Sequence, residues 1–255
     1  MNAGYISGLL KGDVDLRYTP NGVAIASLQL VGERTNNEGR TVFSSIKVQF
    51  FDKQAERYAE TLRDGDPLMA YADVRYRSWE TSEGEKAHTI NVNGKKILRV
   101  LEPETRDTEF GPVLCNCINH FTFIGNTTLA PELKYTPAGD AYCSTSVAYS
   151  IWDFKQKEET SHYIKVKAWR EQANALVKAR KGQPLLVEGP LAWASWTAPN
   201  GDPRGELQLV AEDFTLLDFI RTDAASTSRP TLKPKLDIDD NTGQDDLLPE
   251  EDLPF

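Results

Sequence analysis

LRYTPNG at residues 16–22 returns as LKYTPAG at residues 133–139, which is 117 positions further along the chain. Turn-forming residues and a Ser-Trp pair repeat at the same spacing: Gly8 with Gly125, Gly65 with Gly182, Pro67 with Pro184, Ser78–Trp79 with Ser195–Trp196, and Gly84 with Gly201. A one-residue slip before the third expected strand, undone before Gly65, aligns IKV at 46–48 with IKV at 164–166. Chance does not explain this agreement, so the chain contains two copies of one domain.

Each copy shows mostly short strands bounded by Gly, Pro and Asn, with one helical stretch in the middle. Apolar residues alternate with others over 24–31 and 46–51, as in strands with one buried face. The helical stretches are KQAERYAETLRDG at 53–65 and EQANALVKARKG at 171–182, each ending at a glycine. Three strands, a helix and two further strands are the order of the OB fold. We therefore expect an all-β chain of two tandem OB-fold barrels, with one short helix in each.

Changes in composition divide the chain into four segments. A Gly111-Pro112 turn signal and a cluster of charges mark a short linker. After Arg221, hydrophobic periodicity stops and Ser, Thr, Pro and Asp dominate, which is typical of disorder. The expected segments are OB fold 1 at 1–103, a linker at 104–116, OB fold 2 at 117–221, and a disordered acidic tail at 222–255.

The tail ends in Asp252, Leu253, Pro254 and Phe255, the sequence DLPF. Eight of the last nineteen residues are acidic and none is Lys or Arg, so mutual repulsion favours an extended segment. A basic groove on another protein could attract the acids and accept the terminal ring. We predict a partner-binding tip, and a merely solubilising tail is the alternative.

Net charge is distributed unevenly, at 0 for residues 1–103, −4 for 104–220 and −5 for 221–255. Because neither folded segment is basic, a nucleic-acid partner must be held by local cationic rows and by stacking. The sequence has no membrane-spanning run and no signal segment, and its three cysteines form no disulfide framework, so we expect a cytoplasmic protein.

No catalytic motif is visible, and no cofactor or metal is expected. A metal site is suggested by the closeness of Cys115, Cys117 and His120 in the sequence, but their spacing lacks paired CxxC arms and a clear fourth ligand. A buried small side chain and a loop thiol are the alternative for the two cysteines.

The third strand of the second copy carries the strongest functional signal. Alternation sends Ile164, Val166 and Ala168 into the barrel, so the aromatics and lysines between them point outward. Those outward residues are Tyr163, Lys165, Lys167 and Trp169. Aromatic rings offer faces for bases and the lysines offer charge for phosphates, the combination that single-stranded nucleic acid requires.

The same reasoning selects further residues in both copies. The predicted stacking residues are Phe51, Trp79, Trp152, Tyr163, Trp169 and Trp196, and the predicted phosphate-binding residues are Lys47, Arg75, Arg77, Lys165 and Lys167. Aromatics that merely cover the core, and cations on a solvated face, are the alternatives. Trp152 is placed in an exposed loop, and Trp193 is assigned to the core because it shares parity with Leu191.

The repeat, the YTPxG turn, the IKV strand ending in an aromatic, the SW pair and DLPF together resemble bacterial single-stranded DNA-binding proteins. More narrowly, the chain resembles the form with two OB folds per polypeptide, which assembles as a homodimer of four folds. The resemblance implies sequence-independent binding and protection of single-stranded DNA in replication, recombination and repair, in the cytoplasm at the nucleoid. It also implies recruitment of replication and repair proteins by the terminus. Ser45 departs from the pattern, because an aromatic is expected there.

Two other functions remain open. An interaction adaptor with weakened DNA binding would explain the aromatic-poor first copy and the near-neutral barrels. A nuclease is suggested only by the number of carboxylates, which do not cluster in the sequence.

Overall fold

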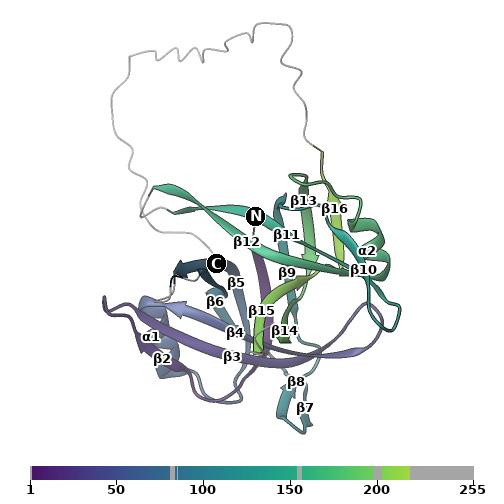
Figure 1. The fold of residues 1–255 in the computed structure, drawn as a ribbon. Helices are drawn as coiled ribbons and strands as arrows, with labels where there is room; N and C mark the ends of the chain where they lie inside the picture. The colour runs from purple at the N-terminus through teal and green to yellow at the C-terminus, as the bar shows by residue number, and fades with distance from the viewer. Residues whose placement is uncertain (1, 81–83, 85, 154–156, 198–202, 219–255) are drawn as a thin grey trace, which may run out of the picture. The chain divides into compact units, whose positions relative to one another are not determined.

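The computed structural model describes residues 2–80, 84, 86–153, 157–197 and 203–218 of the 255-residue chain. The predicted tail at 222–255, with its tip at Asp252–Phe255, lies outside the described residues. Strands dominate the described part, with two helices between them (Figure 1). Neither helix combines the length and the apolar character that crossing a membrane would require.

The first copy forms a closed barrel with one helix. Its elements are β1 (Asn2–Leu10), β2 (Asp15–Tyr18), β3 (Ala24–Thr35), β4 (Thr41–Phe51), α1 (Asp52–Thr61), β5 (Pro67–Glu80) and β6 (Lys86–Arg99). Antiparallel pairs join β1 to β3 and β5, β3 to β4, and β5 to β6. Parallel pairing of β4 with β6, through Val48 opposite Val92, closes the barrel.

The second copy closes in the same way but with interrupted strands. Its elements are β9 (Asn119–Thr127), β10 (Glu132–Tyr135), β11 (Ala141–Asp153), β12 (Glu158–Trp169), α2 (Arg170–Leu176), β13 (Pro184–Gly189), β14 (Leu191–Thr197), β15 (Pro203–Val210) and β16 (Asp213–Leu216). Parallel pairing of β12 with β15 places Val166 opposite Leu209. A break at Pro190 divides what is one strand, β5, in the first copy. Two barrels with this strand order and one helix each confirm the predicted fold class.

The sequence repeat reappears in the element boundaries. β1 and β9 begin at residues 2 and 119, and β5 and β13 begin at residues 67 and 184, again 117 residues apart. Both helices end earlier than predicted, α1 at Thr61 and α2 at Leu176. In α1 the next residue, Leu62, is extended and buried, so the chain leaves the helix to place that side chain in the core. Gly65 follows in the turn to β5, at φ 81°.

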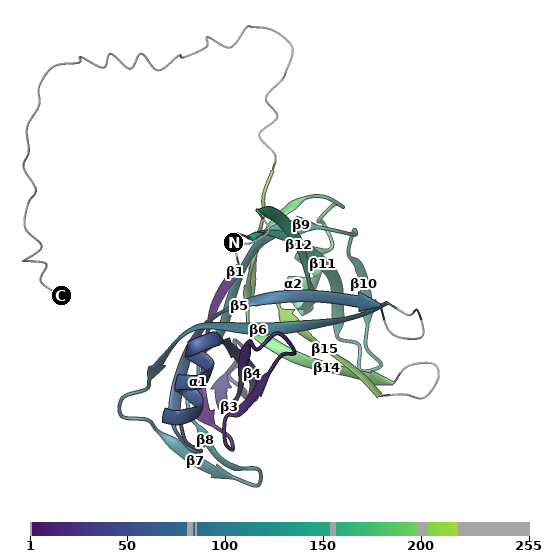
Figure 2. The same cartoon turned by 90° about the vertical axis from the view of Figure 1, so that its left-hand side faces the viewer.

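The barrels are joined by antiparallel pairing of β1 with β9, which lie side by side in Figure 2. Gly4 lies opposite Phe121, its own equivalent in the repeat, and Ile6 lies opposite Asn119. An approximate twofold axis therefore passes through the Gly4–Phe121 pair. A side chain on Gly4 would meet the Phe121 ring at 2.4 Å, so the glycine leaves the space that this ring fills.

Residues in the predicted linker form a hairpin of their own. It consists of β7 (Thr105–Thr108) and β8 (Gly111–Leu114), and β8 pairs in parallel with β3 at Gly32. Val113 and Leu114 are buried with Leu9 and Val31 in a small apolar cluster apart from the main core. This cluster fixes the hairpin against the first copy.

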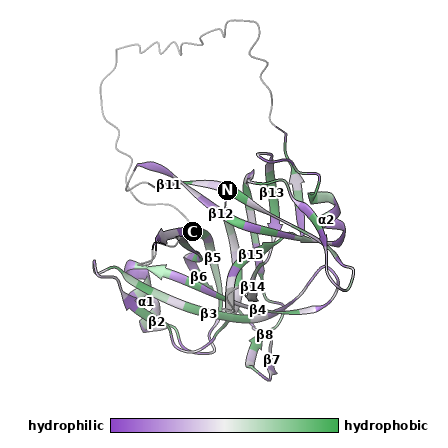
Figure 3. Ribbon diagram, viewed as in Figure 1, coloured by the Kyte–Doolittle hydropathy of each residue, from purple (hydrophilic) through white to green (hydrophobic). Residues whose placement is uncertain are grey.

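Hydrophobic and hydrophilic residues alternate along the barrel strands, as Figure 3 shows. Ala24, Ala26, Leu28 and Leu30 of β3 are buried, and the residues between them are partly exposed. The same alternation in β4 buries Ile46, Val48 and Phe50. The inner faces thus form the core, and the outer faces are free to carry a binding site.

Candidate nucleic-acid interface

The outer face of β12 carries the predicted row of rings and lysines. Ile164, Val166 and Ala168 are buried, whereas Tyr163 is exposed and Trp169 is half-buried. The ammonium of Lys167 lies 4.2 Å from the centroid of the Trp169 ring and 4.9 Å from that of Tyr142. Such cation–π contacts hold the lysine and the rings in one place. Burial, followed by the charge of Lys165, lowers the pKa of Lys167.

Lys165 has a carboxylate partner that the sequence reasoning did not identify. Its ammonium forms an ion pair with Glu206 on β15, and His88 Nε2 lies 3.7 Å from the other oxygen of that carboxylate. Burial alone would raise the pKa of Glu206, but hydrogen bonds from Lys165 and Gln208 lower it overall. A phosphate that bound Lys165 would therefore have to compete with Glu206.

Aromatic side chains continue from β12 onto the first copy. The ring of Tyr76 on β5 meets Tyr163 edge-on at 5.3 Å and stacks on His88 of β6 at 5.4 Å. Tyr76 was not selected from the sequence. Tyr76 lies in a strand of the other copy, so alternation within β12 alone cannot predict its contact with Tyr163.

Three further predicted stacking residues, Trp79, Trp152 and Trp196, lie on separate two-stranded arms. Trp79 near the end of β5 is 45% exposed, and Trp152 is 51% exposed. Trp152 belongs to β11, opposite Glu159, and not to a loop as predicted, because β11 and β12 extend as a two-stranded arm beyond the barrel. Trp196 lies on β14 opposite Arg204, but its side chain is outside the described part of the chain.

The corresponding face of the first copy, on β4, carries fewer lysines. Lys47 is exposed on β4, and Phe51 is half-buried where β4 meets α1. Arg75 on β5 forms an ion pair with Asp73 at 3.0 Å, whereas Arg77 is exposed further along the strand. The structure thus brings Tyr163, Lys165, Lys167 and Trp169 together on β12, and it divides the first-copy residues between β4 and β5.

A groove runs between the two copies beside β4 and β14. One hollow of about 910 Å³ is lined by Trp169, Arg170 and Phe43, and a second of about 480 Å³ is lined by Lys47 and Asn91. Three residues line both hollows, which are therefore neighbours: Ser45, Ile46 and Trp193. One predicted stacking residue, Trp169, and one predicted phosphate-binding residue, Lys47, therefore line neighbouring hollows of this groove.

Trp193 is 66% exposed, so its assignment to the core is wrong. The strand breaks at Pro190, and beyond Leu191 the chain leaves the barrel as a two-stranded arm with β15. On this arm the better covered side chains are Ala192 and Ala194, on the face opposite Trp193. Parity gives the face of a strand but not the point at which the barrel ends.

Two asparagines hold β5 and β14 in place, and neither was predicted from the sequence to do so. Asn2 donates to the Val74 carbonyl at 2.5 Å and accepts from its N–H at 3.1 Å. Asn119 makes the same pair of bonds to Leu191, at 2.8 Å and 2.9 Å. The amides act as an extra backbone link to β5 and to β14. The only signal was an asparagine at both repeat-related positions, 2 and 119.

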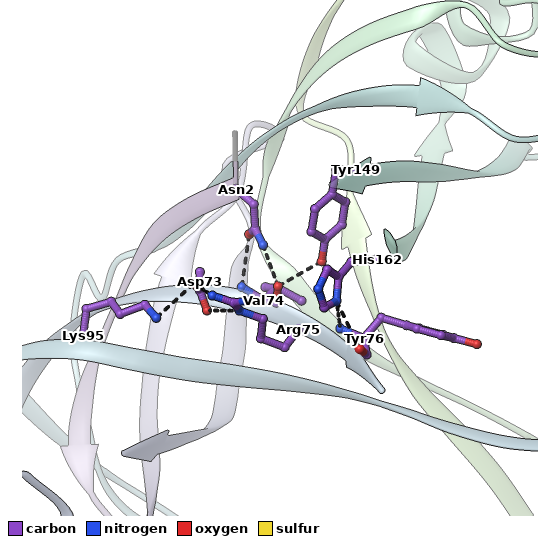
Figure 4. A network of polar contacts seen from close by, with 8 residues as sticks. All are labelled: Asn2, Asp73, Val74, Arg75, Tyr76, Lys95, Tyr149 and His162. Atoms are coloured by element: carbon purple, nitrogen blue, oxygen red, sulfur yellow. Dashed lines mark hydrogen bonds and ion pairs between the residues drawn. The ribbon is translucent and has the colours of Figure 1, made fainter. Parts of the chain in front are cut away.

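A polar network joins the second copy to β5 of the first (Figure 4). The Tyr149 hydroxyl donates to the Val74 carbonyl at 2.9 Å, and His162 Nδ1 lies 3.1 Å from the backbone N and O of Tyr76. Burial, with Arg75 nearby, lowers the pKa of His162. This network fixes the segment of β5 from which Arg75 and Arg77 project.

The cysteines show no metal-binding arrangement within the described ranges. All three are free, and Cys117 and Cys143 are buried, which raises the pKa of each thiol to about 11. No cluster of three or more His, Cys, Asp or Glu able to hold an ion occurs among the described residues.

Two OB-fold barrels with rings and lysines on an outer strand define a tandem OB-fold protein with a candidate oligonucleotide face. The model of the Single-strand binding protein family matches residues 1–100 and again residues 118–217. The chain belongs to this family.

Relatives match over most of the chain. The single-stranded DNA-binding protein of Thermus aquaticus is 35% identical over 264 residues, covering 100% of this chain and 98% of that protein. The protein of the same name from Deinococcus radiodurans is 34% identical over 221 residues, covering 83% and 73%. The crystal structure of the wild-type T. aquaticus protein matches with a TM-score of 0.67 and 28% identity, over 86% of this chain and 94% of that one.

Proposed function

We propose that this protein binds single-stranded DNA without regard to sequence and protects it. The observation that carries the proposal is the outer face of β12, where Tyr163, Lys167 and Trp169 lie in one row. Every base has a face that can stack on these rings, and stacking contributes about 1–3 kcal/mol per base. The names of the T. aquaticus and D. radiodurans relatives support the same function.

Fluorescence titration with oligothymidylate and oligodeoxyadenylate tests the proposal. Both strands should quench tryptophan emission, and Trp169→Ala should weaken binding about tenfold. Tyr135→Ala is the matched control, because Tyr135 is exposed on β10 but borders neither hollow of the groove. Absence of quenching in the unaltered protein, or equal affinity of the Trp169 and Tyr135 variants, would contradict the proposal.

We further propose a role in replication, recombination and repair, in which the tip at Asp252–Phe255 recruits partner enzymes. The acidic run ending in Phe255 supports this role. Removing Leu253–Phe255 should abolish capture of replication and repair proteins in a pull-down. Removing the whole acidic segment should leave DNA affinity equal or higher, since its carboxylates compete with phosphate for the same cations. Weaker DNA binding after truncation would count against this account.

The proposed assembly is a homodimer with four barrels. The narrower resemblance to chains with two OB folds per polypeptide supports it. Light scattering should give twice the 28.5 kDa mass of one chain. A mass of one chain at concentrations that saturate DNA would exclude it.

A further inference from the structure

Trp193 occupies a position that the repeat makes informative. It is the equivalent of Tyr76, 117 residues earlier, and both lie just past the point where their strands leave the barrel. Tyr76 projects from the first copy and packs against Tyr163 on β12 of the second. By the same symmetry, Trp193 of the second copy lies beside β4 of the first.

The equivalent of Tyr163 on β4 is Ser45, which lacks a ring. Ser45 and Trp193 line the same two hollows of the groove. Tyr76 of the first copy meets a ring on β12 of the second, Tyr163, whereas Trp193 of the second copy shares its hollows with a serine of β4. The small side chain leaves Trp193 without a ring from the Ser45 position, although Phe43, further along β4, lines the larger hollow with it.

The ring of Trp193 is supported from its own arm. A side chain on Gly205 of β15 would lie 2.6 Å from Trp193 Nε1, so the indole lies directly over the glycine backbone. With this support Trp193 is still 66% exposed. A tryptophan that served only to cover the core would be buried, so packing does not account for its position.

Groups suited to a nucleotide line the same hollow as the ring. Lys47 is exposed and lines the smaller hollow with Trp193, together with the polar side chains of Gln49 and Asn91. A base stacked on the indole would have an ammonium for its phosphate within the same hollow.

We propose that Trp193 stacks on a base of single-stranded DNA in the groove between β4 and β14. It thereby supplies the first copy with the ring that Ser45 does not provide. The inference rests on the proposed function and extends it, because each copy then contributes a ring to the binding face of the other.

The test combines affinity with photocrosslinking in the full chain. Oligothymidylate carrying 5-iodouracil should crosslink to Trp193, as shown by peptide mapping. Trp193→Ala should lose that crosslink and bind about tenfold more weakly, while Trp193→Phe should stay within a fewfold of the unaltered protein. Tyr135→Ala again serves as the control, and thermal melting should show that each variant is folded.

A second variant places the ring on the first copy itself. Ser45→Tyr combined with Trp193→Ala should regain most of the lost affinity, since the new ring would project into the same hollow. Failure to regain it would show that the ring does not act at this place.

The two proposals fail in different ways. If Trp169→Ala weakens binding and Trp193→Ala does not, the inference about Trp193 is overturned and the proposed function stands. If the unaltered protein neither binds nor crosslinks to the oligonucleotide, both are overturned.

Discussion

Replacing Asn119 with alanine removes the link that holds the start of β14. The variant loses the donor to the Leu191 carbonyl, the acceptor for its N–H, and a bond of 3.1 Å to the Ser44 hydroxyl. Leu191 is only 2% exposed, so water cannot replace the amide without opening the barrel. We expect the variant to be less stable, and we expect the arm that carries Trp193 to be less firmly positioned.

The size of the effect follows from the groups left unpaired. A buried N–H or C=O without a partner costs about 1–3 kcal/mol, so the two groups of Leu191 together cost about 2–6 kcal/mol. Allowing for local relaxation, we expect a loss of about 3 kcal/mol. For a folded region of this size, that loss corresponds to a fall in Tm of about 6–12 °C.

Thermal melting and urea unfolding, followed by circular dichroism, measure this loss. Asn126→Ala is the matched control, because Asn126 is exposed on the same strand and should change stability by less than about 0.5 kcal/mol. DNA affinity should also fall in the Asn119 variant, since β14 carries Trp193 and Trp196. Equal stability of the two variants would refute the structural role assigned to the Asn119 amide.

Three further changes test other parts of the structure. The pKa of His162 lies below its usual 6.5, so the unfolded chain binds the proton first and the stability of the fold falls as the pH drops below about 6.5. Urea unfolding across this range should show that the stability of His162→Gln depends less on pH. Glu206→Gln removes the carboxylate partner of Lys165, so DNA affinity should rise fewfold and the slope of log affinity against log salt should steepen by about 0.7. Gly4→Ala places a carbon 2.4 Å from both the Phe121 ring and the His120 carbonyl, and should destabilise the chain by about 2–3 kcal/mol in the same unfolding assay.

The barrels could be predicted because their information is local and repeated. Alternation over residues 46–51 and 164–169 gives the buried and outer faces of β4 and β12, and both are as the structure has them. The repeat, at a spacing of 117 residues and of 118 in these two strands, then transfers each assignment from one copy to the other. The row formed by Tyr163, Lys167 and Trp169 needed only the parity of one strand.

Features that depend on contacts between distant segments were not predictable. The partner of Lys165 is 41 residues away at Glu206, and the amide of Asn119 binds Leu191 across 72 residues. Trp193 was misassigned because parity with Leu191 cannot show that the strand breaks at Pro190 and leaves the barrel. Each of these features depends on where distant segments of the chain lie relative to one another, and periodicity within one strand carries no information about that.

The Gly4–Phe121 pair determines which halves can associate. Two first copies meeting through β1 would put two glycines on the axis and leave a void, whereas two second copies would drive two phenylalanine rings into the same space. Only the mixed pair fills the site with neither a void nor a clash. Because both copies belong to one chain, the β1 of each chain always has a β9 with which to pair. The two copies are then free to specialise for different parts of the binding face.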